Sequence, residues 1–307
     1  MAKTAYIFPG QGSQYVGMGQ DLYNTYPSAK AVFDRADEIL GFPLSKLCFE
    51  GSEEELELTV NAQPALLVTS IAALEAAREA YPGALPEPIF TAGHSLGEYT
   101  ALTLAGVLNF ETAVTMACER GRLMYEAGLE KPGAMAAVIG MNRELLGEIC
   151  NETGAFIANL NCPGQIVISG TKERVANAMK IAKERGAKLA IQLQVSGAFH
   201  SPLMSSAAEG LTSYIVKTEI ADPVLPVIGN TTARELATAE MVRDELIEQV
   251  CNCIRWEDTI RYMLSRGVDN FIEIGPGEVL TGLVQRISDD VTILNIGDCD
   301  AVELLKA

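Results

Sequence analysis

One stretch of the sequence limits the possible folds more than any other, the series of short segments between Ala134 and Gln194. It reads strand, helix, strand, strand, helix, strand, with AMAAVIG and QIVISG among the strands and KERVANAMKIAKERG as the second helix. This order is the split β-α-β-β-α-β unit of ferredoxin-like domains, and it is complete in about 60 residues. Because strands and helices also alternate on both sides of it, we expect the unit to be inserted into a larger domain.

The flanking segments predict an α/β core. Strands are expected at Thr4 to Phe8 and in PIFTAGH, and helices up to Leu40 and in GEYTALTLAG and FETAVTMACERGRLMYEAG, where apolar residues recur at helical spacing. A turn at Glu53 to Glu57 and a helix from Pro64 to Ala80 are expected between them, and VLPVIGN, DNFIEIG and VTILNIG should be buried strands after His200. The predicted fold class is α/β: an α/β-hydrolase-like core with a parallel sheet (1–130 and 197–307) and an inserted ferredoxin-like β-α-β-β-α-β subdomain (131–196).

The amino-acid composition limits the range of possible functions. With 23 Lys and Arg against 40 Asp and Glu, the net charge of −17 argues against nucleic acid as a partner. No apolar stretch is long enough for a membrane span, and the N-terminus has no secretion signal, so we expect a cytoplasmic protein. The seven cysteines are expected to be buried free thiols, and the C-x-C pair at Cys251 and Cys253 has no nearby histidine, so no metal site is expected. The size of the chain suits a monomer.

The pentapeptide GHSLG, Gly93 to Gly97, predicts a nucleophilic serine. It fits the G-x-S-x-G pattern, and it lies between a predicted strand and a predicted helix, as that pattern requires. Ser95 would then be exposed on a sharp turn, and the N–H of Leu96 together with the helix dipole would stabilise negative charge on a reacting oxygen. The alternative is a chance match in a glycine-rich protein.

A serine nucleophile needs a base, and the chain has two histidines. Because adjacent side chains point apart on a tight turn, His94 is expected to support the turn, which leaves His200 as the general base. Otherwise His200 would be a helix-entry residue capped by Ser201. No aspartate lies between Ser95 and His200, so a backbone carbonyl could orient the imidazole instead. Such a dyad is sufficient for a thioester, because its thiolate leaves easily.

The glycine-rich segment FPGQG follows the first predicted strand. It could bind a nucleotide phosphate, but the third position of that fingerprint is Tyr15 instead of glycine. The second interpretation is that Gln11 donates its main-chain N–H to the reacting acyl oxygen, with Gly10 and Gly12 allowing close approach. We favour the second, because an acyl-serine mechanism needs a second donor besides Leu96.

Arg120 lies in an otherwise apolar predicted helix. Such an arginine usually extends to solvent or pairs with a glutamate, here Glu119 or Glu126. Alternatively its planar guanidinium would bind a substrate carboxylate through two parallel hydrogen bonds.

Taken in order, these motifs resemble the malonyl-CoA:acyl carrier protein transacylase family and the acyltransferase domains of fatty-acid and polyketide synthases. The matching segments are FPGQGSQYVGMG, NAQPALLVTSIAAL, GHSLGEYTAL, ERGRLM, NCPGQIVISG, FHSPLM, EQV and EIGPGEVLTGL. The resemblance implies a ping-pong transfer of malonyl from coenzyme A, through Ser95, to the phosphopantetheine thiol of acyl carrier protein in fatty-acid synthesis. No cofactor is implied beyond coenzyme A as part of the substrate. The alternatives are a trans-acting acyltransferase of a polyketide pathway, a serine thioesterase or esterase, and a non-catalytic scaffold that binds the carrier.

The resemblance also assigns roles to residues. It implies that His200 is the base, that Gln11 and Leu96 form the oxyanion hole, and that Arg120 binds the malonyl carboxylate. Gln63 and Gln249 fall on family positions that line the pocket or support the histidine, the latter through its main-chain carbonyl. Phe199 matches the bulky version associated with malonyl over methylmalonyl, a preference of about 1 to 3 kcal/mol for one methyl group.

An acidic carrier and an acidic enzyme repel each other unless the docking face is locally positive. From Thr171 to Lys188 six basic and two acidic residues give a local net charge of +4. The segment is either an ordinary solvated helix or part of a carrier-docking surface, for which Lys172, Lys180 and Lys183 are the charges to test.

Overall fold

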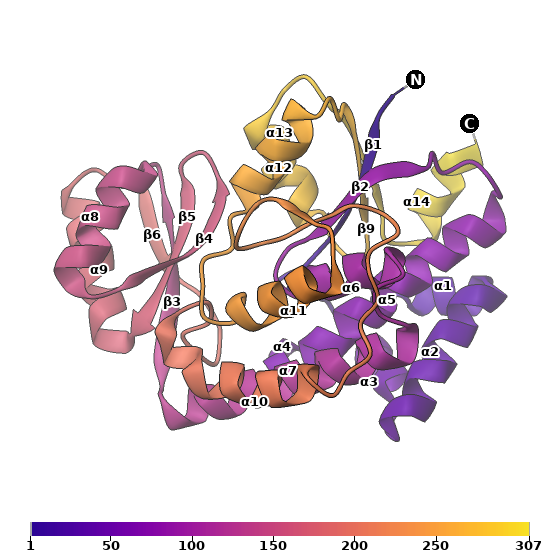
Figure 1. Ribbon diagram of the computed structural model, residues 1–307, viewed down its shortest axis with the longest axis horizontal. Coiled ribbons are helices and arrows are strands. Elements are labelled where there is room, and N and C mark those ends of the chain that lie inside the picture. Colours follow the sequence, from indigo (N-terminus) through magenta and orange to yellow (C-terminus); the bar gives the residue numbers. More distant parts are fainter. Residues whose placement is uncertain (1, 307) are drawn as a thin grey trace.

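The computed structural model describes residues 2–306, which form a larger α/β core and a smaller α/β lobe (Figure 1). The core contains a six-stranded sheet in the order β10-β9-β1-β2-β7-β8. All neighbouring pairs are parallel except β7 and β8, which are antiparallel. The predicted α/β core with a parallel sheet is therefore confirmed. Its strands are β1 (Thr4–Phe8), β2 (Pro88–Gly93), β7 (Val227–Ile228), β8 (Glu235–Leu236), β9 (Asn270–Ile274) and β10 (Thr292–Ile296).

The small lobe is the predicted ferredoxin-like unit. Its four strands pair antiparallel in the order β4-β5-β3-β6, and two helices pack on them. The elements are β3 (Gly133–Ile139), α8 (Arg143–Thr153), β4 (Phe156–Cys162), β5 (Gln165–Thr171), α9 (Lys172–Glu184) and β6 (Leu189–Gln192). An isolated parallel bridge between Asn159 and Ile254 joins β4 to the core. The domain limits 131–196 stay a prediction.

The two faces of the small sheet have different neighbours, because side chains alternate along a strand. On β3, Ala136 and Val138 belong to the apolar cluster with Val175 and Ala178 of α9, whereas Met135 belongs to the cluster of the core. Figure 1 accordingly shows α8 and α9 on the side of the small sheet that faces away from the core. The opposite face is free to form one wall of a site between the two parts.

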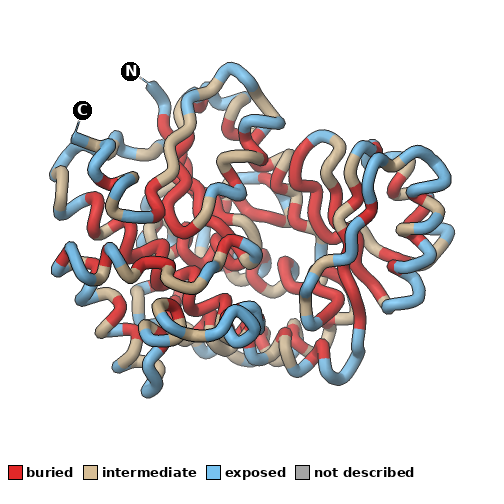
Figure 2. Tube along the Cα trace, turned by 180° about the vertical axis from the view of Figure 1, so that it is seen from behind, coloured by how far each residue is buried: buried red, intermediate tan, exposed pale blue. Residues whose placement is uncertain are grey.

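The helix α5 (Thr59–Ala80) lies at the centre of the core, and most of its residues are buried. Its many alanines permit close packing against α7 (Phe110–Glu130), where a Cβ on Gly121 would lie 2.8 Å from the carbonyl oxygen of Thr59. Figure 2 shows long buried segments in this region. The helices of the core, with two 3₁₀ turns, are α1 (Gln20–Thr25), α2 (Pro27–Leu40), α3 (Leu44–Glu50), α4 (Glu53–Glu57), α5, α6 (Gly97–Leu104), α7, η1 (Pro202–Met204), α10 (Ser205–Ile215), α11 (Ala239–Glu248), α12 (Trp256–Ser265), α13 (Val279–Ile287), α14 (Cys299–Glu303) and η2 (Leu304–Lys306).

Several local predictions were wrong. The acidic segment Glu53–Glu57 is a short helix, because Ser52 and Glu55 form a capping box at its start. The segment VTILNIG forms the edge strand β10, which is only partly buried, and VLPVIGN contributes a strand of only two residues. All seven cysteines are free, but only Cys48, Cys150 and Cys162 are buried. Between residues 2 and 306, no helix is both long and apolar enough to cross a membrane.

Candidate active site

Ser95 lies at the sharp turn between β2 and α6. Its φ of 53° is in the left-handed region, which is unusual for a residue with a side chain. The turn needs the glycines of the motif, because a Cβ on Gly93 would lie 1.9 Å from the carbonyl carbon of Gly97 and a Cβ on Gly97 would lie 2.1 Å from the carbonyl oxygen of Phe8. The strained backbone exposes the Ser95 hydroxyl at the start of a helix, the geometry that the sequence predicted for a nucleophile.

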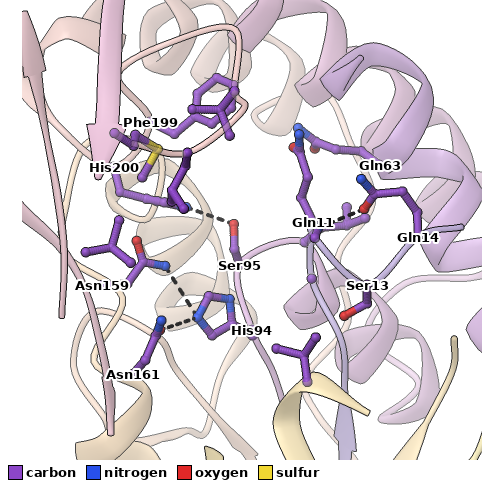
Figure 3. A pocket seen from close by; sticks show the side chains of 18 of the residues that line it. Gln11, Ser13, Gln14, Gln63, His94, Ser95, Asn159, Asn161, Phe199 and His200 are labelled. Atoms are coloured by element: carbon purple, nitrogen blue, oxygen red, sulfur yellow. Dashed lines mark hydrogen bonds between the residues drawn. The ribbon is translucent and has the colours of Figure 1, made fainter. Parts of the chain in front are cut away.

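His200 is placed to act as a base for Ser95. Its Nε2 lies 2.9 Å from Ser95 Oγ, and its Nδ1 lies 2.7 Å from the main-chain oxygen of Gln249 (Figure 3 shows the Ser95 contact). A carbonyl oxygen can only accept, so Nδ1 carries the proton and the lone pair of Nε2 faces the serine. The Gln249 carbonyl thus has the orienting role that an acidic residue has in a triad.

The surroundings of His200 favour the neutral imidazole. Burial, and then the positive charge of Arg120, lower the pKa of His200 to about 3, against the effect of the Gln249 hydrogen bond. At neutral pH the ring is therefore unprotonated and able to accept the proton of Ser95.

Arg120 is buried and points toward the nucleophile. Its Nη1 donates to Gln63 Oε1 at 2.6 Å, and its Nη2 donates to Gln249 Oε1 at 2.8 Å and to Ser95 Oγ at 3.1 Å. The two glutamine oxygens thereby hold the guanidinium plane beside Ser95. Burial lowers the pKa of Arg120, but an arginine keeps its charge in a protein, so a buried cation lies next to the reacting oxygen.

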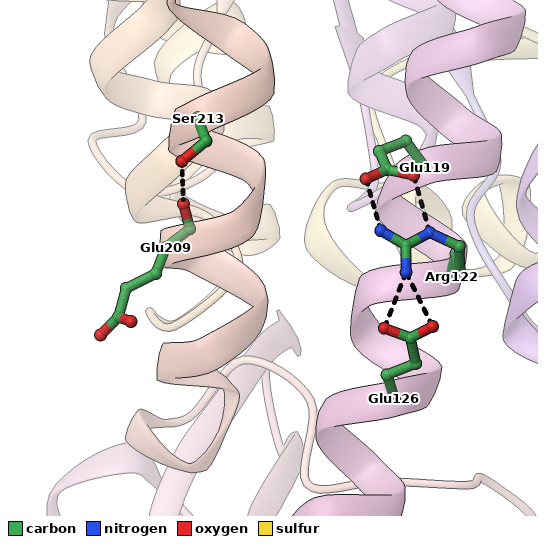
Figure 4. Close-up of polar contacts among 5 residues, drawn as sticks. All are labelled: Glu119, Arg122, Glu126, Glu209 and Ser213. Carbon is green, nitrogen blue, oxygen red and sulfur yellow. Dashed lines mark hydrogen bonds and ion pairs between the residues drawn. The ribbon is translucent and has the colours of Figure 1, made fainter.

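The neighbouring arginine of the same helix makes the ion pairs that the sequence allowed for Arg120. Arg122 is exposed, and it donates to Glu119 and Glu126 at distances between 2.6 and 2.8 Å (Figure 4). The alternative that Arg120 extends to solvent or pairs with these glutamates is therefore wrong.

The two predicted oxyanion donors, Gln11 and Leu96, both line the cavity that contains Ser95. Among residues 2–306 no acceptor is recorded for either main-chain N–H, so both are available for a ligand. Gly10 permits the close approach of the two loops, because a Cβ there would lie 2.3 Å from the carbonyl oxygen of His94. The Gln11 side chain is held by Thr59, whose hydroxyl donates to its Oε1 at 2.9 Å, and the role of both N–H groups in an oxyanion hole stays a prediction.

His94 does not contact the nucleophile side chain. Its Nε2 lies 3.0 Å from Asn161 Oδ1 and 3.3 Å from Asn159 Nδ2, and its ring packs edge to face on Trp256 (Figure 3 shows the two asparagines). These contacts join the turn at Ser95 to β4 of the small lobe, as expected for a histidine that supports the turn.

The cavity above Ser95 has a volume of about 410 Å³. The core contributes Gln63, Met124 and Phe199, and the inner face of the small sheet contributes Met135 and Val167. Apolar side chains thus form much of the wall, and polar residues from several elements, among them Gln14, Glu57 and Gln194, line it as well. Phe199 is buried and lines the cavity, and its role in limiting the acyl group stays a prediction.

The three lysines proposed for carrier docking lie elsewhere. Lys172, Lys180 and Lys183 are all exposed on α9, which packs on the face of the small sheet opposite to the cavity. They are not among the residues that line the cavity.

Two residues of the site were missed from the sequence. The main-chain N–H of Ser95 donates to Asn230 Oδ1 at 2.7 Å, and the buried Glu98 accepts from both Asn230 and Gln249. Asn230 lies two residues after the short strand β7 ends at Ile228, and residues at the carboxyl ends of parallel strands commonly build sites, which is a usable signal. Glu98 gave none, because a glutamate in the first turn of a helix is normally exposed.

The geometry defines a serine acyltransferase with a cation beside the nucleophile, and comparison with known proteins agrees. The family model described as the acyl transferase domain matches residues 5–306, and the chain belongs to this family. The chain is 50% identical to the malonyl CoA-acyl carrier protein transacylase of Bacillus subtilis, over 99% of this chain and 96% of that protein, and 41% identical to a Staphylococcus aureus protein of the same name, over 99% and 98%.

Solved structures give the same result. The acyl-carrier-protein S-malonyltransferase of Bartonella henselae superposes with a TM-score of 0.94 at 37% identity, covering 99% of this chain and all of that one. A malonyl-transacylase solved in complex with a type II polyketide acyl-carrier protein superposes with the same TM-score at 39% identity, with 99% of both chains covered.

Proposed function

We propose that this protein transfers a malonyl group from malonyl-CoA to the phosphopantetheine thiol of acyl carrier protein. The observation that carries the proposal is the buried guanidinium of Arg120, 3.1 Å from Ser95 Oγ. In a malonyl thioester one methylene separates the carboxylate from the reacting carbonyl. A cation next to the nucleophile therefore suits this acyl group, and the identity with named malonyl transacylases supports the same assignment.

The first half-reaction forms an acyl-enzyme. Ser95 Oγ attacks the thioester carbonyl while His200 Nε2 takes its proton, and the N–H groups of Leu96 and Gln11 stabilise the oxyanion. The C–S bond then breaks, and the proton on His200 passes to the leaving coenzyme A sulfur. Arg120 binds the malonyl carboxylate and so holds the carbonyl in line with Ser95.

The second half-reaction is the reverse with a different thiol. His200 accepts the proton of the phosphopantetheine thiol, the sulfur attacks the ester, and the proton returns to Ser95. Water is the competing acceptor, which would make the enzyme a thioesterase. The cavity, with many apolar side chains in its walls between the two parts of the molecule, favours a thiol on a long arm over bulk water.

Intact-protein mass spectrometry after brief mixing with malonyl-CoA tests this function. Wild-type protein should gain one malonyl group, and Ser95→Ala and Arg120→Ala should gain none. Addition of holo acyl carrier protein should remove the adduct, and the carrier should gain the same mass. An adduct that is lost equally fast in plain water would make the protein a hydrolase, and no adduct with any thioester would support a non-catalytic scaffold.

The carrier is proposed to be that of fatty-acid synthesis. One solved relative is in complex with a type II polyketide acyl-carrier protein. The polyketide alternative is therefore tested by a competition between a fatty-acid carrier and a polyketide carrier for the same enzyme. A higher kcat/KM with the polyketide carrier would reassign the pathway. We also propose a cytoplasmic monomer: seven free cysteines fit a reducing compartment, and light scattering during gel filtration measures the oligomeric state.

We still propose that the basic helix α9 promotes binding of the carrier, but only through electrostatic attraction at a distance. Lys172, Lys180 and Lys183 are exposed but face away from the cavity, so they would act by raising the encounter rate with an acidic partner. Replacing all three with glutamate should slow the carrier-dependent step at low salt and leave acylation by malonyl-CoA unchanged. An unaltered carrier dependence at low salt would refute the proposal.

A further inference from the structure

Glu98 is a fully buried carboxylate that contacts no substrate position, yet it binds two side chains of the site. Its Oε1 accepts from the main-chain N–H of Asn230 at 3.0 Å and from Asn230 Nδ2 at 3.2 Å, and its Oε2 accepts from Gln249 Nε2. Burial, and then the nearby Glu245, raise the pKa of Glu98 well above its ordinary value, whereas the bonds from Asn230 and Gln249 oppose that rise. All three partners are N–H donors, so the acceptor-only carboxylate form fits the geometry of this position.

Gln249 in turn binds the catalytic groups. Its Oε1 accepts from Arg120 at 2.8 Å, its Nε2 also donates to the main-chain oxygen of Ser95 at 2.9 Å, and its own main-chain oxygen binds His200. A side-chain amide has one donor end and one acceptor end, and these can exchange by a rotation of about 180°. Which end faces Arg120 therefore depends on what faces the other end.

We infer that Glu98 is a positioning residue: by accepting from Gln249 Nε2 it keeps Gln249 Oε1 directed at Arg120, and so orients the guanidinium for a substrate carboxylate. The inference rests on the proposed function, because it assigns Arg120 to the malonyl carboxylate. Asn230 is held by the same carboxylate, with its Oδ1 on the Ser95 N–H. One buried carboxyl group thus holds two amides, of which one binds the Ser95 N–H and the other the Ser95 main-chain oxygen.

The substitution Glu98→Gln separates the effect of Glu98 on Gln249 from its effect on Asn230. The new amide can keep its oxygen on the two N–H groups of Asn230, but its NH₂ then faces Gln249 Nε2, and two donors cannot bond. Gln249 then either loses its bond to residue 98 and keeps only the one to the Ser95 main-chain oxygen, or rotates so that its NH₂ faces Arg120. In both cases Gln249 Oε1 is held less firmly on Arg120. The Ser95 backbone keeps its bond to Asn230, and the main-chain carbonyl on His200 does not depend on the rotation. The change should therefore affect recognition of the carboxylate more than the reactivity of Ser95.

The experiment compares two acylating agents on the full-length enzyme. Malonyl-CoA carries the carboxylate, and p-nitrophenyl acetate is an activated ester without one. Glu98→Gln should lower kcat/KM for Ser95 acylation by malonyl-CoA by about 10-fold to 100-fold relative to the change with p-nitrophenyl acetate, the usual effect of a lost hydrogen bond to a charged group. Equal losses with both agents would overturn the inference, since a purely structural role would act on both.

Glu273 provides a matched control. It is also fully buried and accepts three hydrogen bonds, from the N–H groups of Leu280 and Thr281 and from the Thr281 hydroxyl, at 2.7 to 3.1 Å. Leu280 lines the cavity, but neither Leu280 nor Thr281 hydrogen-bonds to Ser95, His200 or Arg120, so Glu273→Gln should leave the ratio of the two agents unchanged.

Two further measurements distinguish a failure of this inference from a variant that does not fold. If Glu98→Gln does not fold, Glu98→Asp keeps the charge but is one methylene too short to reach both partners, and it should shift the ratio in the same direction. In a Gln249→Met background, Glu98→Gln should cause no further change of the ratio, because the residue through which it acts is gone. If wild-type protein is not acylated by malonyl-CoA, the proposed function has failed; if it is and the ratio does not move, only this inference has failed.

Discussion

The charge of Arg120 should control the protonation of His200. Arg120 Nη2 and His200 Nε2 both contact Ser95 Oγ, at 3.1 and 2.9 Å, so the two nitrogens are at most about 6 Å apart, the sum of those distances. At an effective dielectric constant of about 20, two unit charges about 6 Å apart repel by about 2.8 kcal/mol, which corresponds to about 2 pH units. The pKa of His200 is lowered to about 3, so Arg120→Met should raise it to about 5 while burial keeps it below its ordinary value.

The sign of the effect on catalysis follows. A histidine below its pKa is protonated and cannot take the proton of Ser95, so acylation is lost as the pH falls through the pKa of the folded enzyme. In wild-type protein this loss should occur only in strong acid. In Arg120→Met it should begin near pH 5, with the rate measured on the neutral ester p-nitrophenyl acetate so that substrate charge is not a factor.

Long-range ¹H–¹⁵N NMR measures the titration directly, because the chain has only two histidines and His200→Gln identifies the second signal. Arg120→Lys is the matched control: it keeps the positive charge, and His200 should stay neutral at pH 5. A His200 that titrates near pH 6.5 in wild-type protein would refute the burial argument, and equal titrations in the Met and Lys variants would refute the charge argument.

Two further predictions concern the shape of the site. Phe199→Ala should improve acylation by methylmalonyl-CoA relative to malonyl-CoA by about 1 to 3 kcal/mol in the specificity ratio, measured as two kcat/KM values, because the new space admits one methyl group; an unchanged ratio would mean that Phe199 does not set selectivity. Gly97→Ala should lower the free energy of unfolding by at least about 1 to 3 kcal/mol, because its Cβ would lie 2.1 Å from the carbonyl oxygen of Phe8. Urea unfolding measures this, and a midpoint equal to wild type would show that the turn can relax.

The features that could be predicted from the sequence are those that local residue patterns determine. The order of strands and helices in the small lobe follows from periodicity, and the turn at Ser95 follows from glycines at fixed spacing between a strand and a helix. The missing aspartate was itself informative, because it pointed to a carbonyl partner for His200, and the structure places the Gln249 oxygen there. The segment Glu53–Glu57 was predicted as a turn and is a helix, because its capping box was not recognised, and β10 was predicted to be buried and is only partly so, because its edge position was not recognised.

The amide network could not be predicted from residue patterns. Glu98 and Asn230 are 132 positions apart in sequence, and their contact depends on the packing of α6 against the end of β7. The direction in which a helical residue faces, inward for Arg120 and outward for Arg122, is likewise decided by tertiary packing. The lysines of α9 show the same limit, because a local excess of positive charge does not reveal which face of a sheet the helix covers.

The environment of Arg120 leads to a last prediction about stability. This buried cation donates hydrogen bonds to Gln63, Gln249 and Ser95 and lies over the ring of Tyr99, and all four groups are neutral. A buried charge without a contacting counterion is costly, and a carboxylate that reaches it supplies the missing partner. Free malonate should therefore bind the native state and raise the midpoint of thermal unfolding, whereas malonamide, which is uncharged and of similar size, should not.

The size of this shift follows from linkage. Malonate at about 100 times its Kd adds about 2.7 kcal/mol to the free energy of unfolding, which for a chain of this length raises the midpoint by about 4 °C. Arg120→Met removes the cation and should abolish the shift, while Arg120→Lys should keep part of it, since an ammonium offers charge without the two parallel donors of a guanidinium. Two results would contradict this prediction: equal shifts with malonate and malonamide, or a malonate shift that persists in the Arg120→Met variant. Either would show that Arg120 does not bind the carboxylate and that its buried position has only a structural role.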